Sequence, residues 1–323
     1  MHLIGTYTPP RGDAAGIHTL DAAGRVDLLV GLGSPSFVAA HPTLPMIYAV
    51  DEHRGLLNVV RTDDDTARVV QGDLVAGSAA CHVRVADDGG SVVVACWGDG
   101  AVIRYALGSD GLVTDRVAVP PIERLPAGVP SRAHASIALG AGFVTTDLGA
   151  DVLRVWSGDA SPRELQRLDL PTGSGPRHLV AHPNGSLYVV TEYSGEIVRV
   201  TTDAGRLEIA SRAPTRVGAW VEGDTAAEIA LHPSGEWLTI GVRGSDVMAS
   251  SRIRPDGSTE PVAEAPCGGA IPRHHVHDGD DVLVANQGSS LITRLPFDPA
   301  TGALGPVTAS YPVGTPTLLL RLG

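Results

Sequence analysis

The sequence predicts an all-β protein, a seven-bladed β-propeller, from three observations. A hairpin pattern recurs along the chain at intervals of 44 to 52 residues. The 39 glycines and 24 prolines supply frequent turns, and they interrupt any helical periodicity within about ten residues. The opening and closing segments each supply part of one further repeat, so that seven repeats of about 46 residues fill the 323-residue chain.

The clearest copy of the repeat runs from Ser174 to Glu192, with the sequence SGPRHLVAHPNGSLYVVTE. Two strand-like runs flank Pro183-Asn184-Gly185, residues that supply the fixed and the positive φ angles of a tight turn. A hairpin brings its two open ends side by side. We therefore expect Arg177, His178 and Glu192 to emerge at the same edge of this hairpin.

The position of His178 serves as a marker for the other copies. With its equivalents, the marker positions are Phe37, His82, His134, His178, Glu228 and His274. Successive markers are separated by 45, 52, 44, 50 and 46 residues. A period of about 40–50 residues with roughly four short strands per unit is the signature of a propeller, in which each blade is one twisted sheet. The seventh copy is split, because 316–323 and 3–8 would each give one strand. The C-terminal segment would then close the ring against the N-terminal strand.

The chain is expected to form a single domain over residues 1–323. No linker rich in Pro, Ser or Gly and no run of like charges marks a boundary, and a ring of blades tolerates this length as one domain. The two longest spacings fall at 120–130 and around 216–224. Long loops over a rigid scaffold commonly cover a site, and we expect the first of these segments to be such a loop.

Composition limits the possible partners and the cellular location. The formal net charge of −12 argues against nucleic acid and anionic membranes, although converging arginines can still bind a small phosphorylated substrate. The three cysteines, Cys81, Cys96 and Cys267, show no disulfide pattern and indicate a reducing compartment. There is no leader-like N-terminus and no run of 18 apolar residues. We expect a soluble, cytoplasmic monomer.

Several segments resemble the signature segments of the seven-bladed lactonase family, the propeller type of 6-phosphogluconolactonase. They are GTYT with GIHTL, HPTLPMIYAVDE, HASIALGAGFVTTDLGADV, SGPRHLVAHPNGSLYVVTE, AAEIALHPSGEWLTIGVRGSD, PRHHVHDGDDVLVANQGSS and FDPATGAL. The resemblance spans nearly the whole chain. It implies hydrolysis of 6-phospho-D-glucono-1,5-lactone or a related sugar lactone in the pentose phosphate pathway, without a metal or other cofactor. Because the family also includes muconate-lactonising cyclases, it indicates fold more strongly than substrate.

The resemblance also assigns the family's polar channel positions to residues of this chain. They are Glu52, His134, Asp147, Arg177, His178, Glu192, Glu228, Arg243, Arg273, Asn286 and Gln287. Two departures bear on substrate identity. Cys96-Trp97-Gly98 stands where a segment similar to Asn-Tyr-Gly is common, and His274-His275 stands where an aromatic or apolar pair is usual.

The residue types suit the opening of a lactone by water. This reaction needs a base for the water proton and donors for the tetrahedral oxyanion, but it needs no covalent intermediate. Accordingly, there is no G-x-S-x-G motif, and the cysteines lie in apolar strands. The predicted catalytic residues are Glu228, Glu192, His178 and Arg177, with His134 as a further candidate base. The predicted substrate-binding residues are Arg243, Arg273, His134, Glu52, Asp147, Asn286 and Gln287.

Of the two glutamates, Glu228 is the favoured base. It occupies the marker position of the innermost strand, nearest the channel axis. Glu192 lies at the far end of its hairpin and would mainly orient Arg177.

Structural roles are alternatives for many of these residues. A Glu or His at a strand end can cap backbone groups or pair with an Arg of the next blade. Asp147 and Asp151 flank a glycine and favour a turn. His41, His182 and His232 are predicted to be turn residues. Of His274, His275 and His277, only the last two share a strand face, so no metal site is predicted.

Two other functional classes remain open at this point. A non-catalytic propeller would bind a ligand or a protein through its faces, although the chain contains no Trp-Asp dipeptide and its charges recur on the channel side. A cyclase or isomerase acting on muconate-type diacids would use the same arginines for carboxylates. The sequence does not separate phosphate recognition from carboxylate recognition.

Overall fold

The computed structural model describes residues 1–63, 66–122, 125–203 and 206–322. In these ranges the chain is built from β-strands and turns, with one short 3₁₀ helix, η1 (Gln287–Ser289). Its contacts group it into two compact units. The first comprises Met1–Asp169 with Leu320–Gly323, and the second comprises Leu170–Leu319. The single domain of 323 residues stays a prediction.

The first unit contains four sheets, in the strand orders β29-β1-β2-β3, β4-β5-β6-β7, β8-β9-β10-β11 and β12-β13-β14-β15. The strands are β1 (His2–Thr6), β2 (Gly16–Leu20), β3 (Val26–Gly31), β4 (Val38–Ala40), β5 (Met46–Asp51), β6 (Leu56–Asp63), β7 (Thr66–Val75), β8 (Ala80–Val85), β9 (Ser91–Cys96), β10 (Val102–Leu107), β11 (Val113–Ala118), β12 (Ala133–Leu139), β13 (Gly142–Asp147), β14 (Val152–Trp156), β15 (Glu164–Asp169) and β29 (Pro316–Arg321), of which only Leu320 and Arg321 fall in this unit.

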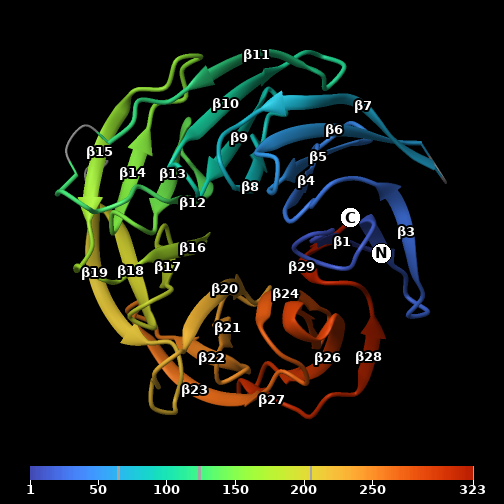
Figure 1. Ribbon diagram of the computed structural model, residues 1–323. Helices are drawn as coiled ribbons and strands as arrows, with labels where there is room; N and C mark the ends of the chain where they lie inside the picture. Colours follow the sequence, from blue (N-terminus) through green and yellow to red (C-terminus); the bar gives the residue numbers. More distant parts are fainter. Residues whose placement is uncertain (64–65, 123–124, 204–205, 323) are drawn as a thin grey trace. The chain divides into compact units, whose positions relative to one another are not determined.

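The second unit contains three sheets, in the orders β16-β17-β18-β19, β20-β21-β22-β23 and β24-β25-β26-β27, with β28 also paired to β26. The strands are β16 (Pro176–Ala181), β17 (Leu187–Thr191), β18 (Glu196–Asp203), β19 (Arg206–Pro214), β20 (Thr225–Leu231), β21 (Trp237–Arg243), β22 (Val247–Ile253), β23 (Thr259–Pro266), β24 (Pro272–Asp278), β25 (Asp281–Asn286), β26 (Leu291–Asp298), β27 (Ala303–Leu304) and β28 (Ala309–Pro312). In Figure 1 the strands of each of these three sheets carry neighbouring colours, because each of the three is one continuous stretch of chain.

The predicted repeat count is confirmed for the described residues, whose strands form seven sheets. The predicted splitting of one repeat between the two chain ends is also confirmed. β29 joins β1 in one sheet, and the Leu322 N–H donates to the Met1 carbonyl at 3.0 Å. This pairing gives the N-terminal strand a partner on the side that would otherwise be an open edge.

The hairpin turns form as the sequence predicts. Between β16 and β17, the His182 N–H donates to the Ser186 carbonyl at 2.9 Å, and Gly185 adopts a φ of 84°. The His182 Nδ1 accepts the Asn184 N–H at 3.0 Å. His41 and His232 accept the backbone N–H two residues further on in the same way, at 3.1 Å each. The prediction that these three histidines are turn residues is confirmed.

Burial distinguishes the strands within each sheet. The second strands β5, β9 and β17 are buried along their whole length, whereas the fourth strands β7 and β15 contain no buried residue among those described. A strand that is buried on both faces has a nearly continuous apolar sequence instead of an alternating one. Cys81 and Cys96 are buried, as expected of small core residues.

The two long connections differ in what the structure describes. In the segment 120–130, Glu123 and Arg124 lie outside the described residues. The second connection, before β20, is tied down by Arg216. Its guanidinium lies 3.0 Å from Asp224 and 2.9 Å from Glu264, so the connection is anchored at its start, at its end and to β23.

Candidate functional site

Six of the predicted site residues belong to one end of the second unit's sheets. Each lies near the start of a first strand or at the end of a second strand, and antiparallel pairing brings these positions to the same edge. They are Arg177 and His178 in β16, Glu192 after β17, Glu228 in β20, Arg243 at the end of β21, and Arg273 in β24.

A β-bulge in each first strand aims these side chains. The pairing register shifts between Pro176 and Leu179 in β16, between Ala226 and Ile229 in β20, and between Pro272 and His274 in β24. A bulge breaks the strict alternation of side chains and re-aims them. As a result, Arg177 and His178, although consecutive, both contact β20. The first donates to the Ala227 carbonyl at 2.8 Å, and the second meets the Glu228 carboxylate at 2.5 Å.

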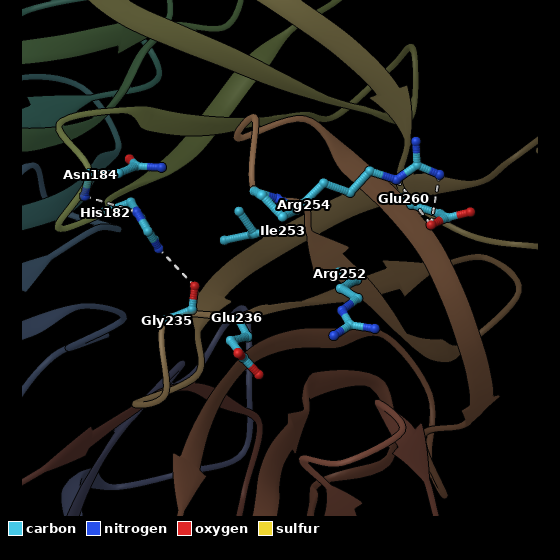
Figure 2. Close-up of a pocket in the computed structure, with 9 residues that line it drawn as sticks. His182, Asn184, Gly235, Glu236, Arg252, Ile253, Arg254 and Glu260 are labelled. Carbon is cyan, nitrogen blue, oxygen red and sulfur yellow. Dashed lines mark hydrogen bonds and ion pairs between the residues drawn. The ribbon is translucent and has the colours of Figure 1, made fainter.

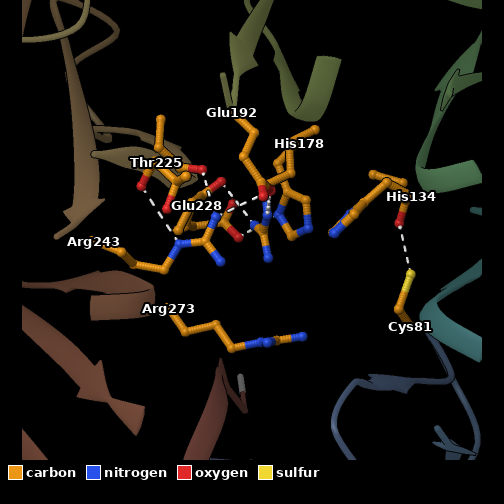
Figure 3. A network of polar contacts seen from close by, with 12 residues as sticks. Cys81, His134, His178, Glu192, Thr225, Glu228, Arg243 and Arg273 are labelled. Carbon is orange, nitrogen blue, oxygen red and sulfur yellow. Dashed lines mark hydrogen bonds and ion pairs between the residues drawn. The ribbon is translucent and has the colours of Figure 1, made fainter. Parts of the chain in front are cut away.

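Glu192 lies between two guanidinium groups. Its Oε2 is 3.0 Å from the Nε of Arg177 and 3.0 Å from an Nη of Arg243. Figure 3 shows this network, in which Arg243 also donates to the Ala226 carbonyl at 3.1 Å. All three charged side chains are largely buried, with exposures of 3%, 16% and 17% for Arg177, Glu192 and Arg243. Glu192 therefore holds both arginines in place.

The site carries concentrated positive charge. Burial, followed by the charge of Arg243, lowers the pKa of Arg177 to about 10. Burial also lowers the pKa of Arg243, and Arg273 acts in the same direction. Guanidinium groups that destabilise one another in this way would bind an anion strongly, because the anion relieves their repulsion and accepts their hydrogen bonds.

Glu228 is held by two imidazoles. Its Oε2 lies 2.5 Å from the Nδ1 of His178 and 3.3 Å from the Nε2 of His274. The Leu319 N–H donates to the Nδ1 of His274 at 3.4 Å, so the proton of this neutral ring is on Nε2, facing the carboxylate. Burial, followed by the charge of Arg177, lowers the pKa of His178 well below its usual value. Burial lowers the pKa of His274 to about 3. Two neutral histidines therefore donate to one carboxylate.

The remaining predicted residues of this unit have supporting roles. Gln287 accepts a hydrogen bond from Arg273 at 3.2 Å, which orients that guanidinium. Asn286 is fully buried and donates to the Thr293 hydroxyl at 2.9 Å inside its own sheet. The structure therefore favours a role for Asn286 in holding the blade together.

Glu52 and Asp147 belong to the first unit, where each carboxylate has partners. Glu52 accepts the Tyr7 hydroxyl at 2.8 Å and lies 3.1 Å from Arg11. Asp147 accepts the Arg132 N–H at 2.7 Å, the Ala150 N–H at 2.9 Å and the Ser131 hydroxyl. The contacts of Asp147 are those of a turn-forming residue, which was the alternative role expected from its neighbouring glycine.

His134 also belongs to the first unit and is buried in β12. Its backbone carbonyl lies 3.6 Å from the Cys81 sulfur, which can donate weakly to it (Figure 3). This contact links β12 to the neighbouring strand β8. The role of the His134 imidazole stays a prediction.

His275 and His277 do share one face of β24, as predicted. Their Nε2 atoms lie 2.9 and 3.0 Å from the hydroxyl oxygen of Thr239 in β21. Within the described parts of the chain, no three side chains of His, Cys, Asp or Glu are grouped so that they could hold a metal ion.

One feature of the repeat escaped the sequence analysis. In six repeats we compare the residue at the end of the second strand, or directly after it, with the residue three positions further along the chain. That later residue has a positive φ in every case. The first set is Glu52, Trp97, Leu148, Glu192, Arg243 and Gln287, and the second is Gly55, Gly100, Asp151, Gly195, Asp246 and Ser290. Glu192, Arg243 and Gln287 are thus equivalent positions of successive blades. The recurring Gly, Asp or Ser at a fixed offset was the available signal.

A recess of about 620 Å³ lies at the opposite end of these strands, beside the turns that contain His182 and Gly235 (Figure 2). Arg254, which lines it, is paired with Glu260 at 2.8 Å. Both side chains are about half exposed, and exposed pairs of this kind bind weakly. The recess therefore lacks the buried, converging charges of the Glu192 network.

Comparison with known proteins places these observations in a family. The sequence model described as "Lactonase, 7-bladed beta-propeller" matches residues 1–320. A Bacillus subtilis protein named 6-phosphogluconolactonase is 25% identical, and the alignment covers 96% of each chain. A Serratia proteamaculans protein of the same name is 24% identical over 97% of each chain. The predicted seven-bladed propeller is confirmed.

Solved structures agree on the fold. A Pseudomonas aeruginosa protein described as a periplasmic gluconolactonase superposes with a TM-score of 0.88 at 24% identity, over 100% of this chain and 99% of its own. A Lactobacillus plantarum protein gives the same score and identity, with coverage of 100% and 99%. Among the residues that the structure describes, none of the helical segments has the length and hydropathy of a membrane-spanning helix.

Proposed function

We propose that this chain, which belongs to the lactonase family of seven-bladed β-propellers, hydrolyses a sugar lactone, with 6-phospho-D-glucono-1,5-lactone as the preferred substrate. The observation that carries the proposal is the set of buried guanidinium groups around Glu192, next to a carboxylate held by two neutral histidines. The first group provides anion recognition, and the second provides a base in a site of low dielectric constant.

The proposed reaction is direct attack by water. Glu228 takes one proton from the water as its oxygen adds to the lactone carbonyl carbon, and a guanidinium of the site stabilises the resulting oxyanion. The carbonyl re-forms, the bond to the ring oxygen breaks, and the proton passes to that oxygen. The product is the open-chain 6-phosphogluconate, and no group is left on the protein.

The geometry suggests a role for each side chain. The N–H donors of His178 and His274 fix the Glu228 carboxylate through Oε2, so Oε1 is the oxygen we assign to the water proton. Arg177 is the most deeply buried of the arginines and contacts β20 beside Glu228, which suits stabilisation of the oxyanion. Arg243 and Arg273 would hold the phosphate, because planar guanidinium groups bind phosphate through two parallel hydrogen bonds.

The proposal extends to the cellular setting. A phosphorylated sugar lactone belongs to the pentose phosphate pathway, which is cytoplasmic, and we propose that the protein acts there as a monomer without a cofactor. The net charge of −12 supports a small-molecule partner over nucleic acid or an anionic membrane. Because one structural relative is described as periplasmic, fractionation of cells that express the gene from its natural start checks the location directly.

A substrate panel tests the proposed function. Purified protein is assayed with 6-phosphogluconolactone, unphosphorylated gluconolactone and muconolactone, each corrected for spontaneous hydrolysis in buffer. We expect the highest kcat/KM for the phosphorylated lactone, and a loss of most of that preference in Arg273→Gln. Rates equal to the buffer rate for all three lactones would reject the proposal, and activity on muconolactone alone would favour the cyclase class.

A further inference from the structure

Tyr193 interrupts a pattern that most of the blades share. Tyr193 directly follows Glu192, and the residue at the equivalent position is glycine in four of six repeats. The six residues are His53, Gly98, Gly149, Tyr193, Gly244 and Gly288. The second unit thus has a large aromatic side chain where its other two repeats, and two of the first unit's repeats, have none.

Close approach of the preceding loop explains the glycines. A Cβ atom on Gly244 would lie 2.5 Å from the Gly223 carbonyl oxygen, and one on Gly288 would lie 2.9 Å from the Ile271 side chain. A Cβ on Gly149 would collide with the Pro130 carbonyl. In these repeats the loop before the first strand occupies the space that a side chain would need.

In the repeat of Tyr193 the glycine lies in the loop before the first strand instead. The loop residue here is Gly175, with a φ of +65°, and a Cβ on it would lie 2.6 Å from the tyrosine ring. The Tyr193 N–H donates to the Ser174 carbonyl at 3.1 Å, and the Glu192 N–H donates to the Gly175 carbonyl at 2.7 Å. The backbone therefore fixes the ring against a glycine that leaves room for it.

Packing within the protein does not by itself account for the Tyr193 ring. Tyr193 is 45% exposed, so much of its apolar surface gains nothing from burial in the protein. It directly follows Glu192, whose carboxylate lies 3.0 Å from the Arg243 guanidinium. A rigid, half-exposed aromatic ring therefore stands beside the arginine network.

We propose that Tyr193 is a binding platform for the ring of the substrate, a six-membered sugar lactone whose C–H face stacks on the phenol ring while Arg243 holds an anionic or oxygen substituent. Aromatic rings offer large contact area with few rotatable bonds and a negative face that attracts C–H groups. This inference rests on the proposed function for its substrate class. The inference assigns to Tyr193 the recognition of the substrate's ring, which arginines alone would not provide.

The test measures binding and catalysis in parallel. Wild type, Tyr193→Gly and Tyr193→Phe are compared by KM and kcat with 6-phosphogluconolactone, and by calorimetric Kd with the corresponding 1,5-lactam, a ring analogue that is not hydrolysed. Glycine is the residue at this position in four of the other five repeats, so Tyr193→Gly is expected to fold. Ile209→Ala, which removes a partly exposed apolar side chain from β19 of the same sheet, is the matched control.

We expect Tyr193→Gly to raise both KM and the lactam Kd about tenfold, which corresponds to about 1.4 kcal/mol of lost stacking, with little change in kcat. Tyr193→Phe and Ile209→Ala should stay within about threefold of wild type. An unchanged lactam Kd in Tyr193→Gly, a loss in Tyr193→Phe as large as that in Tyr193→Gly, or absence of lactam binding to wild type would overturn the inference. Lactam binding that needs Tyr193, in a protein without lactonase activity, would keep the platform and reject the proposed function.

Discussion

Strand β16 carries a histidine near each end, and the two have opposite environments. His178, near the start, is buried and meets Glu228 of the next blade at 2.5 Å. His182, just past the end, is half-buried, accepts the Asn184 N–H at 3.0 Å and lies 2.7 Å from the Gly235 carbonyl oxygen of the next blade. Both histidines connect the same two sheets.

The two histidines differ in the groups that their ring nitrogens bind. At the turn, both ring nitrogens of His182 bind backbone groups, so the side chain works as a structural brace. At the other end, His178 donates to an ionisable carboxylate among three arginines, where burial strengthens every electrostatic interaction. Two identical side chains in one hairpin thus separate into a stabilising role and a proposed catalytic role.

The largest expected effect is on catalysis at the buried end. Glu228→Gln keeps the shape and hydrogen-bond acceptor that His178 and His274 contact but removes the basicity, so kcat should fall by about 10²–10⁴. Glu192→Gln should mainly raise KM, because Arg177 and Arg243 lose a charged partner. Steady-state kinetics separate the two outcomes. Glu236→Gln, at the turn end, is the matched control, and full activity in both site variants would reject the general-base assignment.

The buried histidines also predict how stability depends on pH. Burial lowers the pKa of His275 to about 4 in the folded protein, whereas its usual value is 6.5. Below pH 6.5 the unfolded chain takes up a proton that the folded protein does not, so stability falls as the pH decreases toward 4. For His275 this amounts to about 2 kcal/mol at pH 5.

Urea unfolding at pH 7.5 and pH 5.0 measures this loss. His277 behaves alike, with a pKa lowered by burial to about 4, and His277→Gln should therefore reduce the difference between the two pH values. Equal unfolding free energies at both pH values in the wild type would show that these imidazoles are not kept neutral by burial.

A smaller effect is expected when guanidinium geometry is changed and charge is kept. Arg243→Lys retains a cation but loses the planar pair of donors that contacts Glu192 and the backbone of β20, so KM should rise by about tenfold while kcat changes less. Arg252→Lys, in the exposed recess at the turn end, is the control and should match wild type. An unchanged KM in Arg243→Lys would remove this residue from substrate binding.

The smallest expected effect belongs to the structural histidine. His182→Ala removes one acceptor and one donor that link the turn to Gly235, and it should lower the free energy of unfolding by about 1–2 kcal/mol. Its kcat and KM should equal those of wild type. A catalytic defect at constant stability would contradict the separation of roles between the two ends of β16.

Much of the fold and part of the site could be predicted from local sequence. Pro183-Asn184-Gly185 encodes the turn between β16 and β17, and the spacing of the repeats encodes seven sheets, since turn geometry and strand pairing depend on neighbouring residues. The same local pattern places Arg177, His178 and Glu192 at one edge of a hairpin. The structure described here contains all of these features.

Tertiary structure decided which of these side chains meet. His178 and Glu228 are 50 residues apart in the chain, and the sequence alone gives no register between separate blades. The bulge in β16, which turns two consecutive side chains toward β20, left no signal that we identified in the residue pattern. The sequence by itself thus determined the repeat and the kinds of group at its ends, because these follow from local backbone preferences. The ion pairs, the lowered pKa values of the histidines and the position of the Tyr193 ring against Gly175 were decided by packing, because they depend on burial and on contacts between segments that are distant in the sequence.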